Sequence, residues 1–224
     1  ASQHGAGGSA TLHGDRLIFS GDGHYEAWVI ALDKRTGDVK WKTERRKPFD
    51  QAYTTPLVIP VNGRDQVVSV GAYRATAYDV ETGKEIWIHT NLQGLTRRGI
   101  NYWESLEKND KRLVFTLNNS IQEIDAITGK SIDSFADSGF VDMRAGLDRD
   151  PTSIRRMQAM MPGVIHNDLL ILGSAPGEGY FSPPGHIRAY NIVTGKLEWT
   201  FHTVPHPGEF GYDTWPKDAY KYVG

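Results

Sequence analysis

A short unit that occurs four times constrains the fold of this chain more than any other feature of its sequence. Each copy is an alternating apolar segment that ends in Asp or Asn, followed by two further residues and then Thr-Gly. The Asp or Asn is found at Asp33, Asp79, Asp125 and Asn191, with spacings of 46, 46 and 66 residues. A repeat of this length is typical of folds that stack similar supersecondary units. The chain is therefore expected to fold as four similar parts, with an insertion between the last two.

The repeated unit predicts a β-hairpin. Asp, Asn and Thr side chains hydrogen-bond to the backbone of a tight turn, and Gly supplies the positive φ that such a turn needs. A second strand follows, and in three copies it carries a Trp four residues after the Gly, namely Trp41, Trp87 and Trp199, whereas the third copy has Asp133 there. Because a Trp offers a large flat surface, we expect the three Trp to be buried between neighbouring units and Asp133 to mark a weaker junction.

Two more strand-like runs precede each hairpin, at residues 9–13 and 16–20, 56–60 and 66–71, 99–105 and 112–117, and 163–166 and 169–173. Four strands per unit at this period predict an all-β fold, a β-propeller of four-stranded antiparallel blades with four blades in the chain. The expected blades cover about residues 9–45, 53–91, 98–136 and 162–203 of a single propeller segment spanning 1–224, and residues 204–224 form a C-terminal extension. Residues 151–161 are expected to hold either a helical turn, since Pro151 suits a first helical position, or an ordered loop.

Composition excludes several classes of function. With 25 basic and 27 acidic residues, the chain lacks the basic footprint of a nucleic-acid-binding protein. No apolar run approaches the roughly 18 residues that a membrane-spanning helix requires. The chain begins at Ala1 without a charged and apolar leader, so any signal peptide is expected to have been removed or never to have been present. Cysteine is absent, which rules out disulfides and Cys-based zinc sites.

The repeat Ala-x-Asp-x-x-Thr-Gly-x-x-x-Trp resembles the tryptophan-docking motif of pyrroloquinoline-quinone (PQQ) dehydrogenases and their non-catalytic relatives. Residues 96–103, 173–179 and 199–209 are similar to PQQ-dependent alcohol and glucose dehydrogenases, whereas the sequence before about residue 87 looks more like the PQQ-like repeat propellers that include outer-membrane assembly factors. The chain is therefore a candidate chimera joined near residues 87–91, or a product of natural repeat shuffling. The resemblance implies an eight-bladed ring and a periplasmic location.

The same resemblance implies a set of site residues. Arg98 occupies the position of an Arg that contacts the quinone, a role suited to a planar and permanently charged guanidinium, although a structural surface Arg is the alternative. Ser174 and Ala175 occupy the turn that faces the quinone. Glu178 matches a carboxylate that binds the calcium ion of the family, since calcium prefers several oxygen ligands; a solvated loop residue is the alternative.

Other residues depart from the family pattern. Met160 and Met161 stand where the family has Ser or Thr that hydrogen-bond to the quinone, and a vicinal disulfide is impossible without Cys. The stacking Trp, the Asn and Asp that complete the calcium site and the Asp base of the family lie beyond Gly224. We therefore assign no catalytic residue and expect the chain alone to hold neither PQQ nor calcium and to lack activity.

Three functions follow from these observations. The chain is expected to assemble as a homodimer that closes one eight-bladed ring, because a half ring would expose apolar blade faces, with a closed four-bladed ring as the alternative. The second function is a PQQ- and calcium-dependent dehydrogenase of alcohols or sugars. The third is a non-catalytic scaffold that binds protein segments.

A second group of polar residues lies near the C-terminus. His202, His206, Glu209 and Asp213 are of the types that bind transition metals. The family resemblance instead implies that this stretch is an ordered connection between blades. Both interpretations are kept as hypotheses.

Overall fold

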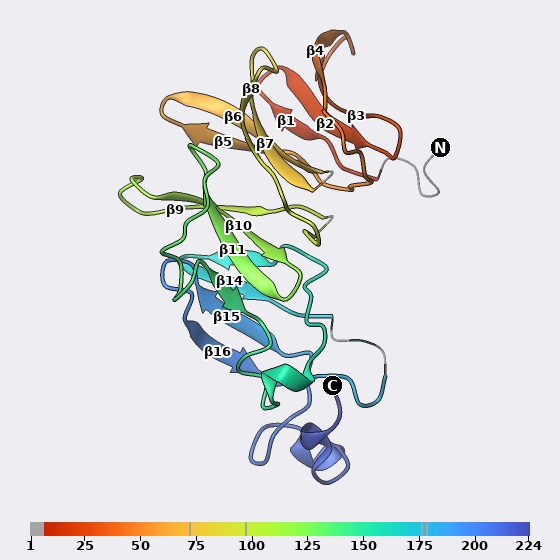
Figure 1. Ribbon diagram of the computed structural model, residues 1–224, viewed down its shortest axis with the longest axis vertical. Helices are drawn as coiled ribbons and strands as arrows, with labels where there is room; N and C mark the ends of the chain where they lie inside the picture. The colour runs from red at the N-terminus through yellow and green to blue at the C-terminus, as the bar shows by residue number, and fades with distance from the viewer. Residues whose placement is uncertain (1–6, 72, 97, 176, 178) are drawn as a thin grey trace.

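The computed structural model describes residues 7–71, 73–96, 98–175, 177 and 179–224. They form four sheets, each of four antiparallel strands paired in the order of the chain (Figure 1). This confirms the predicted all-β class and the four four-stranded blades of a propeller segment.

The strands of the first two blades follow the predicted runs closely. Blade 1 contains β1 (Thr11–His13), β2 (Arg16–Asp22), β3 (Ala27–Asp33) and β4 (Val39–Glu44). Blade 2 contains β5 (Leu57–Val61), β6 (Arg64–Gly71), β7 (Arg74–Asp79) and β8 (Glu85–His89). In both blades β-branched residues such as Val29 and Val67 are buried in the strands, as a pleated strand covered by neighbouring sheets favours.

The last two blades are less regular. Blade 3 contains β9 (Asn101–Glu104), β10 (Lys111–Leu117), β11 (Ser120–Asp125) and β12 (Phe140–Asp142). Blade 4 contains β13 (Val164–His166), β14 (Leu169–Leu172), β15 (Ile187–Asn191) and β16 (Leu197–Phe201). In blade 3 the last strand starts well after the hairpin turn. Residues 131–139 between them form a loop, in which one isolated β-bridge joins Ile124 and Ser131.

Three short 3-10 helices complete the secondary structure of the described residues: η1 (Pro151–Ser153), η2 (Tyr212–Thr214) and η3 (Ala219–Lys221). Pro151 occupies the first turn of η1, and the Asp150 side chain caps that turn through the backbone N–H of Thr152. The helical turn considered for residues 151–161 is thus present in its first residues. No helix in the described part of the chain is both long and apolar enough to cross a bilayer.

The hairpin turn has the geometry that the repeat predicts. In blade 1, Asp33 Oδ1 accepts hydrogen bonds from the backbone N–H groups of Arg35 (2.8 Å) and Thr36 (3.1 Å). Asn191 Oδ1 does the same in blade 4, at 3.0 and 2.9 Å. Gly37 has a φ of 78°, and the Gly of the other three turns has a φ between 69° and 74°. The Thr-Gly pair therefore closes the turn in every blade.

The motif Gly also receives the Trp of the preceding blade. The Trp41 ring lies over Gly83 so closely that a Cβ there would be 2.5 Å from it, and Trp41 Nε1 donates to the Val80 carbonyl at 3.0 Å. Trp87 lies over Gly129 in the same way and donates to the Ala126 carbonyl at 3.3 Å. The two rings are 7% and 9% exposed, which confirms their predicted burial between blades.

The prediction for Trp199 is wrong. Its residue is 40% exposed, because Trp199 lies on the last strand of blade 4 and no blade in the described part of the chain follows to cover it. At the junction before it, where blade 3 has no Trp, Ala136 and Val141 approach the motif Gly195 instead. Asp133 itself is exposed.

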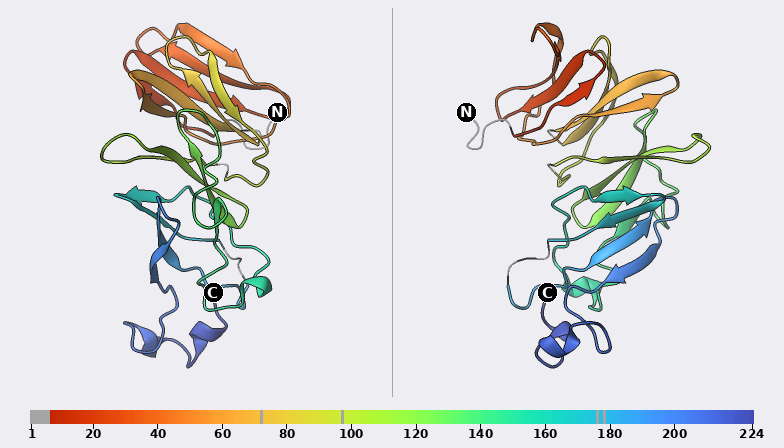
Figure 2. Two further views of the ribbon diagram at one scale, coloured as in Figure 1. Left: turned by 60° about the vertical axis from the view of Figure 1, so that its left-hand side comes forward. Right: turned by 180° about the vertical axis from the view of Figure 1, so that it is seen from behind.

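The hydrophobic core is divided among the junctions between blades. One cluster joins blades 1 and 2, and includes Trp41 and Tyr78. A second joins blades 2 and 3, and a third joins blades 3 and 4. Blades 1 and 2 lie side by side toward one end of the long axis, blade 3 lies in the middle, and blade 4 lies between blade 3 and the C-terminal segment (Figures 1 and 2). Blades 1 and 4 are far apart in each view, so the four sheets form an open arc and not a closed four-bladed ring.

Candidate functional site

A cavity of about 390 Å³ lies where loops of blades 2 and 3 meet the segment that leads into blade 4. The segment between β8 and β9, the end of β10 with its turn, and the residues before β13 supply most of its wall. The lining residues are Tyr53, Gly94, Leu95, Thr96, Arg98, Thr116, Asn118, Arg156, Gln158, Ala159 and Met160.

The wall of this cavity is cationic. Arg98 and Arg156 both contribute to it, and none of the described lining residues is acidic. Arg98 is exposed, and its Nη1 lies 3.6 Å from the Met161 sulfur, which is only a weak acceptor. Arg156 Nε donates to Gln158 Oε1 at 2.8 Å. Two guanidinium groups without a lining carboxylate suit an anionic ligand, because Arg pairs readily with carboxylates.

The other predicted quinone contacts lie beside the same wall. The Ala175 N–H donates to the Gln158 carbonyl at 2.7 Å, and the two residues form an isolated β-bridge. Ser174 Oγ is buried and has no hydrogen-bond partner among the described residues. The segment 156–161 therefore links the two predicted stretches, since Arg98 reaches Met161 and Ala175 pairs with Gln158. Glu178, the predicted calcium ligand, lies outside the described residues.

The two Met residues do not make the cavity apolar throughout. Met160 lines it, and both Met side chains are exposed. The backbone beneath them is held by Thr96 Oγ1, which donates to the Met160 carbonyl at 3.1 Å, and by Thr116 Oγ1, which lies 3.5 Å from the Ala159 carbonyl. Sequence reasoning missed Thr96, Thr116, Asn118 and Arg156. Only Thr96 had a signal, because it begins the stretch that contains Arg98.

A comparison with protein families identifies this architecture. A family model for the β-propeller domain of glucose, ethanol and alcohol dehydrogenases, the PQQ family, matches residues 43–224. The chain belongs to the PQQ propeller family. This confirms the resemblance inferred from the repeat. The match also includes residues 87–91, where the resemblance changes from the non-catalytic PQQ-like propellers to the PQQ-dependent dehydrogenases.

Individual relatives of this PQQ propeller are larger proteins. Quinoprotein glucose dehydrogenase A of Acinetobacter calcoaceticus is 27% identical over 210 residues, which cover 79% of this chain and 24% of that protein. The quinate/shikimate dehydrogenase (quinone) of Acinetobacter baylyi is 26% identical over 223 residues, which cover 88% of this chain and 26% of that protein. The chain thus spans about a quarter of the length of these curated relatives.

Solved structures share the fold of the PQQ propeller. The quinohemoprotein alcohol dehydrogenase of Comamonas testosteroni superimposes with a TM-score of 0.61 at 19% identity, over 90% of this chain and 35% of that one. BamB of Moraxella catarrhalis superimposes with a TM-score of 0.53 at 18% identity, over 87% of this chain and 51% of that one. At these identities the likeness concerns the blade architecture alone.

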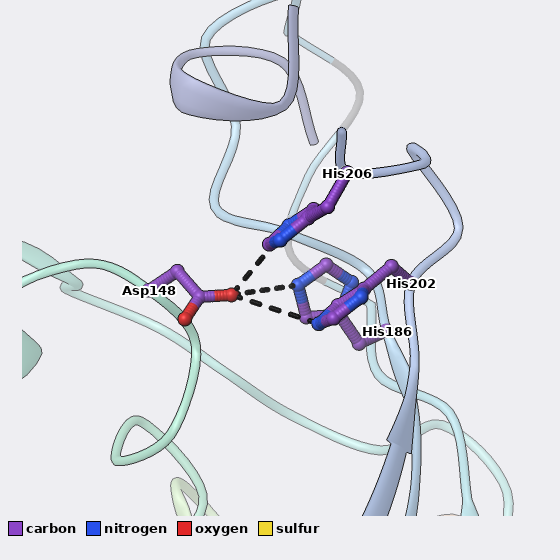
Figure 3. A group of neighbouring side chains, drawn as sticks. All are labelled: Asp148, His186, His202 and His206. Atoms are coloured by element: carbon purple, nitrogen blue, oxygen red, sulfur yellow. Dashed lines mark ion pairs between the residues drawn. The ribbon is translucent and has the colours of Figure 1, made fainter. Parts of the chain in front are cut away.

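The PQQ propeller gathers a second set of polar side chains beyond blade 4. The sequence singled out a group of possible metal ligands near the C-terminus. Of that group, His202 and His206 lie together, whereas Asp213 belongs to η2 and is not part of the cluster. Two residues that sequence reasoning missed, Asp148 and His186, complete the group (Figure 3). Burial lowers the pKa of His186 to about 4, so its imidazole is neutral near pH 7. No pattern in the sequence connects Asp148 and His186 with the C-terminal histidines, because the fold alone brings these segments together.

Proposed function

We propose that this chain is a quinone-binding segment of a PQQ-dependent dehydrogenase and that its cationic cavity holds the anionic cofactor. One observation carries the proposal: two Arg side chains line a cavity with no acidic residue in its described wall, in a chain of the PQQ family. PQQ carries several carboxylates and two quinone oxygens, and guanidinium groups bind such oxygens well. The relatives named above act on glucose and on quinate or shikimate, as their names state.

The residues of the chain fit a flat, polar ligand. In the cavity wall Arg98 and Arg156 supply charge and Asn118 adds an amide. Ser174 Oγ, a buried donor that lacks a partner among the described residues, lies outside that wall. The sequence argument against a bound quinone was based on the two Met residues, the absence of Cys and the family groups expected beyond Gly224. Thr96 and Thr116 supply other polar groups in the wall beside Met160, which answers the first of these points. Bound PQQ would supply the two-electron oxidation of an alcohol or sugar carbon. Glu178 is proposed to hold calcium beside it.

The ring must be completed for this function. Blade 4 leaves Trp199 and Phe201 exposed, and blade 1 leaves Leu12 and Val39 exposed, so both ends of the arc present apolar side chains to solvent. We propose that a second copy of the chain covers them and gives eight blades in a closed dimer. Further blades of a longer polypeptide would provide the same cover. A periplasmic location is proposed from the same family membership.

Binding of PQQ tests the proposal. Purified protein is titrated with PQQ in the presence of calcium, and binding is followed by fluorescence quenching. Arg98→Gln is expected to weaken binding about tenfold or more, because a charge-assisted hydrogen bond contributes roughly 1.5–3 kcal/mol. Arg35→Gln is the matched control, since Arg35 is exposed in the turn of blade 1 and lies outside the cavity wall.

Dye reduction with glucose or a simple alcohol is measured on the same samples. The chain alone is expected to bind PQQ without turnover, because catalytic groups that act as a unit fail together when some are missing. Equal PQQ affinity in the wild type and Arg98→Gln would contradict the assignment of the cavity. Absence of PQQ binding altogether would instead support the non-catalytic scaffold.

A further inference from the structure

Four potential ligand atoms converge at the outer end of blade 4. They belong to Asp148, which follows β12, to His186, which precedes β15, and to His202 and His206, which follow β16. All four atoms lie within 4.8 Å of one another. Figure 3 shows the three imidazoles gathered around the Asp148 carboxylate from separate segments of the chain, with the rings of His202 and His206 stacked at a centroid distance of 3.7 Å.

The spacing of these atoms is close to that of a tetrahedral metal site. Asp148 Oδ2 lies 3.8 Å from His186 Nε2, 3.7 Å from His202 Nε2 and 3.6 Å from His206 Nε2. Zinc bonds of about 2.0–2.2 Å at the tetrahedral angle separate neighbouring ligand atoms by about 3.3–3.6 Å. Coordination by all four groups would therefore need a small inward movement of exposed Asp148 and a tilt of the stacked His202 and His206 rings toward a common point.

His186 points independently to a ligand at this place. Its residue is only 2% exposed, and both of its ring nitrogens are buried without a hydrogen-bond partner among the described residues. A buried polar group without a partner is costly, so such groups in native proteins usually bind something. An ion between His186 and the other three groups would satisfy the Nε2 atom that faces them.

Glu209 orients the two C-terminal histidines. Its Oε1 lies 2.7 Å from His202 Nδ1, and its Oε2 accepts the backbone N–H of His206 at 2.7 Å. An Nδ1–H that donates to Glu209 leaves the Nε2 lone pair of His202 free and directed toward Asp148. Metal-binding histidines are characteristically held in this way, by a carboxylate on the ring nitrogen that does not bind the metal.

We propose that Asp148, His186, His202 and His206 bind one divalent transition-metal ion of the zinc class, with Glu209 as the residue that positions His202. Three imidazoles favour such an ion over calcium or magnesium, which prefer oxygen ligands. Four protein ligands fill a tetrahedral shell, as in structural zinc sites. This site is separate from the cationic cavity, with which it shares no residue.

The ion would fasten the C-terminal segment to blade 4. His186 and His202 flank strands of that blade. Asp148 belongs to the loop after blade 3, and His206 belongs to the segment beyond β16. Cross-linking of these segments stabilises the folded state whenever the metal binds the folded chain better than the unfolded one.

Zinc binding to the tag-free chain tests the proposal. The protein is stripped with a chelator, dialysed and titrated with Zn²⁺ by calorimetry, and a parallel sample receives Co²⁺, whose visible absorption reports tetrahedral coordination. We expect one ion per chain, a tetrahedral Co²⁺ spectrum and a higher Tm with Zn²⁺. Glu209→Gln is expected to weaken binding about 10- to 100-fold, the usual effect of losing the partner of a metal-bound histidine.

His206→Gln and Asp148→Asn change residues that are partly or largely accessible, so both variants should fold, as circular dichroism would verify. Each is expected to weaken zinc binding by more than tenfold. His166→Gln is the control, because His166 is an exposed histidine of β13 outside the group. The proposal is overturned if the wild type does not take up zinc at one ion per chain, or if His206→Gln binds zinc with the affinity of the wild type.

Discussion

At the scale of single residues, the turn Asp carries much of the information in the repeat. One carboxylate oxygen of Asp33 accepts two backbone N–H groups, from Arg35 and Thr36, and these bonds, together with the Lys40 ammonium 3.2 Å from the other oxygen, lower the pKa of this partly exposed side chain to about 2. Asn191 makes the same two bonds in blade 4 without a charge. The turn therefore requires an acceptor oxygen at this position. Where that residue is Asp, its charge also makes the stability of the turn depend on pH.

Asp33→Asn should remove part of the acid sensitivity of the fold. The pKa of Asp33 is about 2 in the folded chain and 3.8 in its ordinary state, so its stabilising effect is present above about pH 4 and is lost as the pH falls toward 2. The amide keeps the acceptor but does not titrate in this range. Urea unfolding at pH 5 and at pH 2.5 should show a smaller loss of stability for the variant. Asp137→Asn, at an exposed loop position, is the control, and an equal loss in Asp33→Asn and the wild type would contradict the role of Asp33.

Trp87→Ala should destabilise the chain by about 3–5 kcal/mol, the usual cost of deleting a core aromatic side chain. Trp87 is buried over Gly129 and donates to the Ala126 carbonyl across the junction of blades 2 and 3. Trp199 belongs to the same motif but is 40% exposed, so Trp199→Ala should cost less than half as much. Denaturant unfolding measures both values. A cost below about 1 kcal/mol for Trp87→Ala would contradict its role at the junction.

At the scale of elements, the third hairpin replaces an apolar pair with an ion pair. In blades 1, 2 and 4 the motif Ala lies directly opposite the Trp of the next strand, as in the pair Ala77 and Trp87. In blade 3 the position of the Ala is taken by Glu123, and there is no Trp. Arg112 Nη1 lies 2.8 Å from Glu123 Oε2 and 3.1 Å from the Ile192 carbonyl of blade 4. Burial raises the pKa of Glu123 to about 7 despite the neighbouring guanidinium. A polar link thus spans the junction that lacks the Trp.

Arg112→Leu should destabilise the protein by about 3–5 kcal/mol, because the buried carboxyl of Glu123 loses its cation and must take up a proton, and the Ile192 carbonyl loses a donor. The double variant Arg112→Leu with Glu123→Leu should recover a large part of that loss, since an apolar pair of similar volume removes the buried carboxyl that has no partner. Urea unfolding near neutral pH compares the three proteins. If the double variant were as unstable as the single one, the loss would come from packing and not from the isolated carboxylate.

The elements also show what the sequence could and could not predict. The hairpins were predicted because their turns are local: Asp33 and Gly37 are close in the chain and fix the geometry together. The delayed start of β12 was not predicted, because the spacing of the other hairpins was applied to the third, although residues 131–139 contain three Ser, two Asp and one Gly, a composition typical of a loop. Trp199 was predicted to be buried because its motif matches, but burial depends on a neighbour that the motif does not encode.

The same distinction between local and long-range information applies to the candidate site. Arg98, Ser174 and Ala175 could be named from local motifs, and the structure places them beside one wall. Arg156 joins Arg98 only through folding, as Asp148 and His186 join His202 only through folding, and a single sequence does not record such contacts between distant segments.

At the scale of the whole molecule, the open arc of four blades leads us to predict a dimer that closes the ring. If a second copy completes the ring, the chain should sediment as a dimer at micromolar concentration. Phe201→Glu should then give a monomer, because Phe201 is 60% exposed on the last strand of blade 4 and would be buried in the closed ring. Phe210→Glu is the control, as Phe210 is also exposed but lies in the C-terminal segment. Sedimentation of the wild type as a stable monomer would contradict the dimer.

The division of the core among the junctions makes the blades behave like links in a one-dimensional chain with nearest-neighbour coupling. A blade has little stability of its own, because its apolar side chains are shared with the blades beside it. An open row of four blades has one junction fewer than it has blades, whereas a closed ring has as many junctions as blades. Ring closure therefore adds cohesion without adding residues, and it removes the two loosely held ends from which unfolding of an open row would begin.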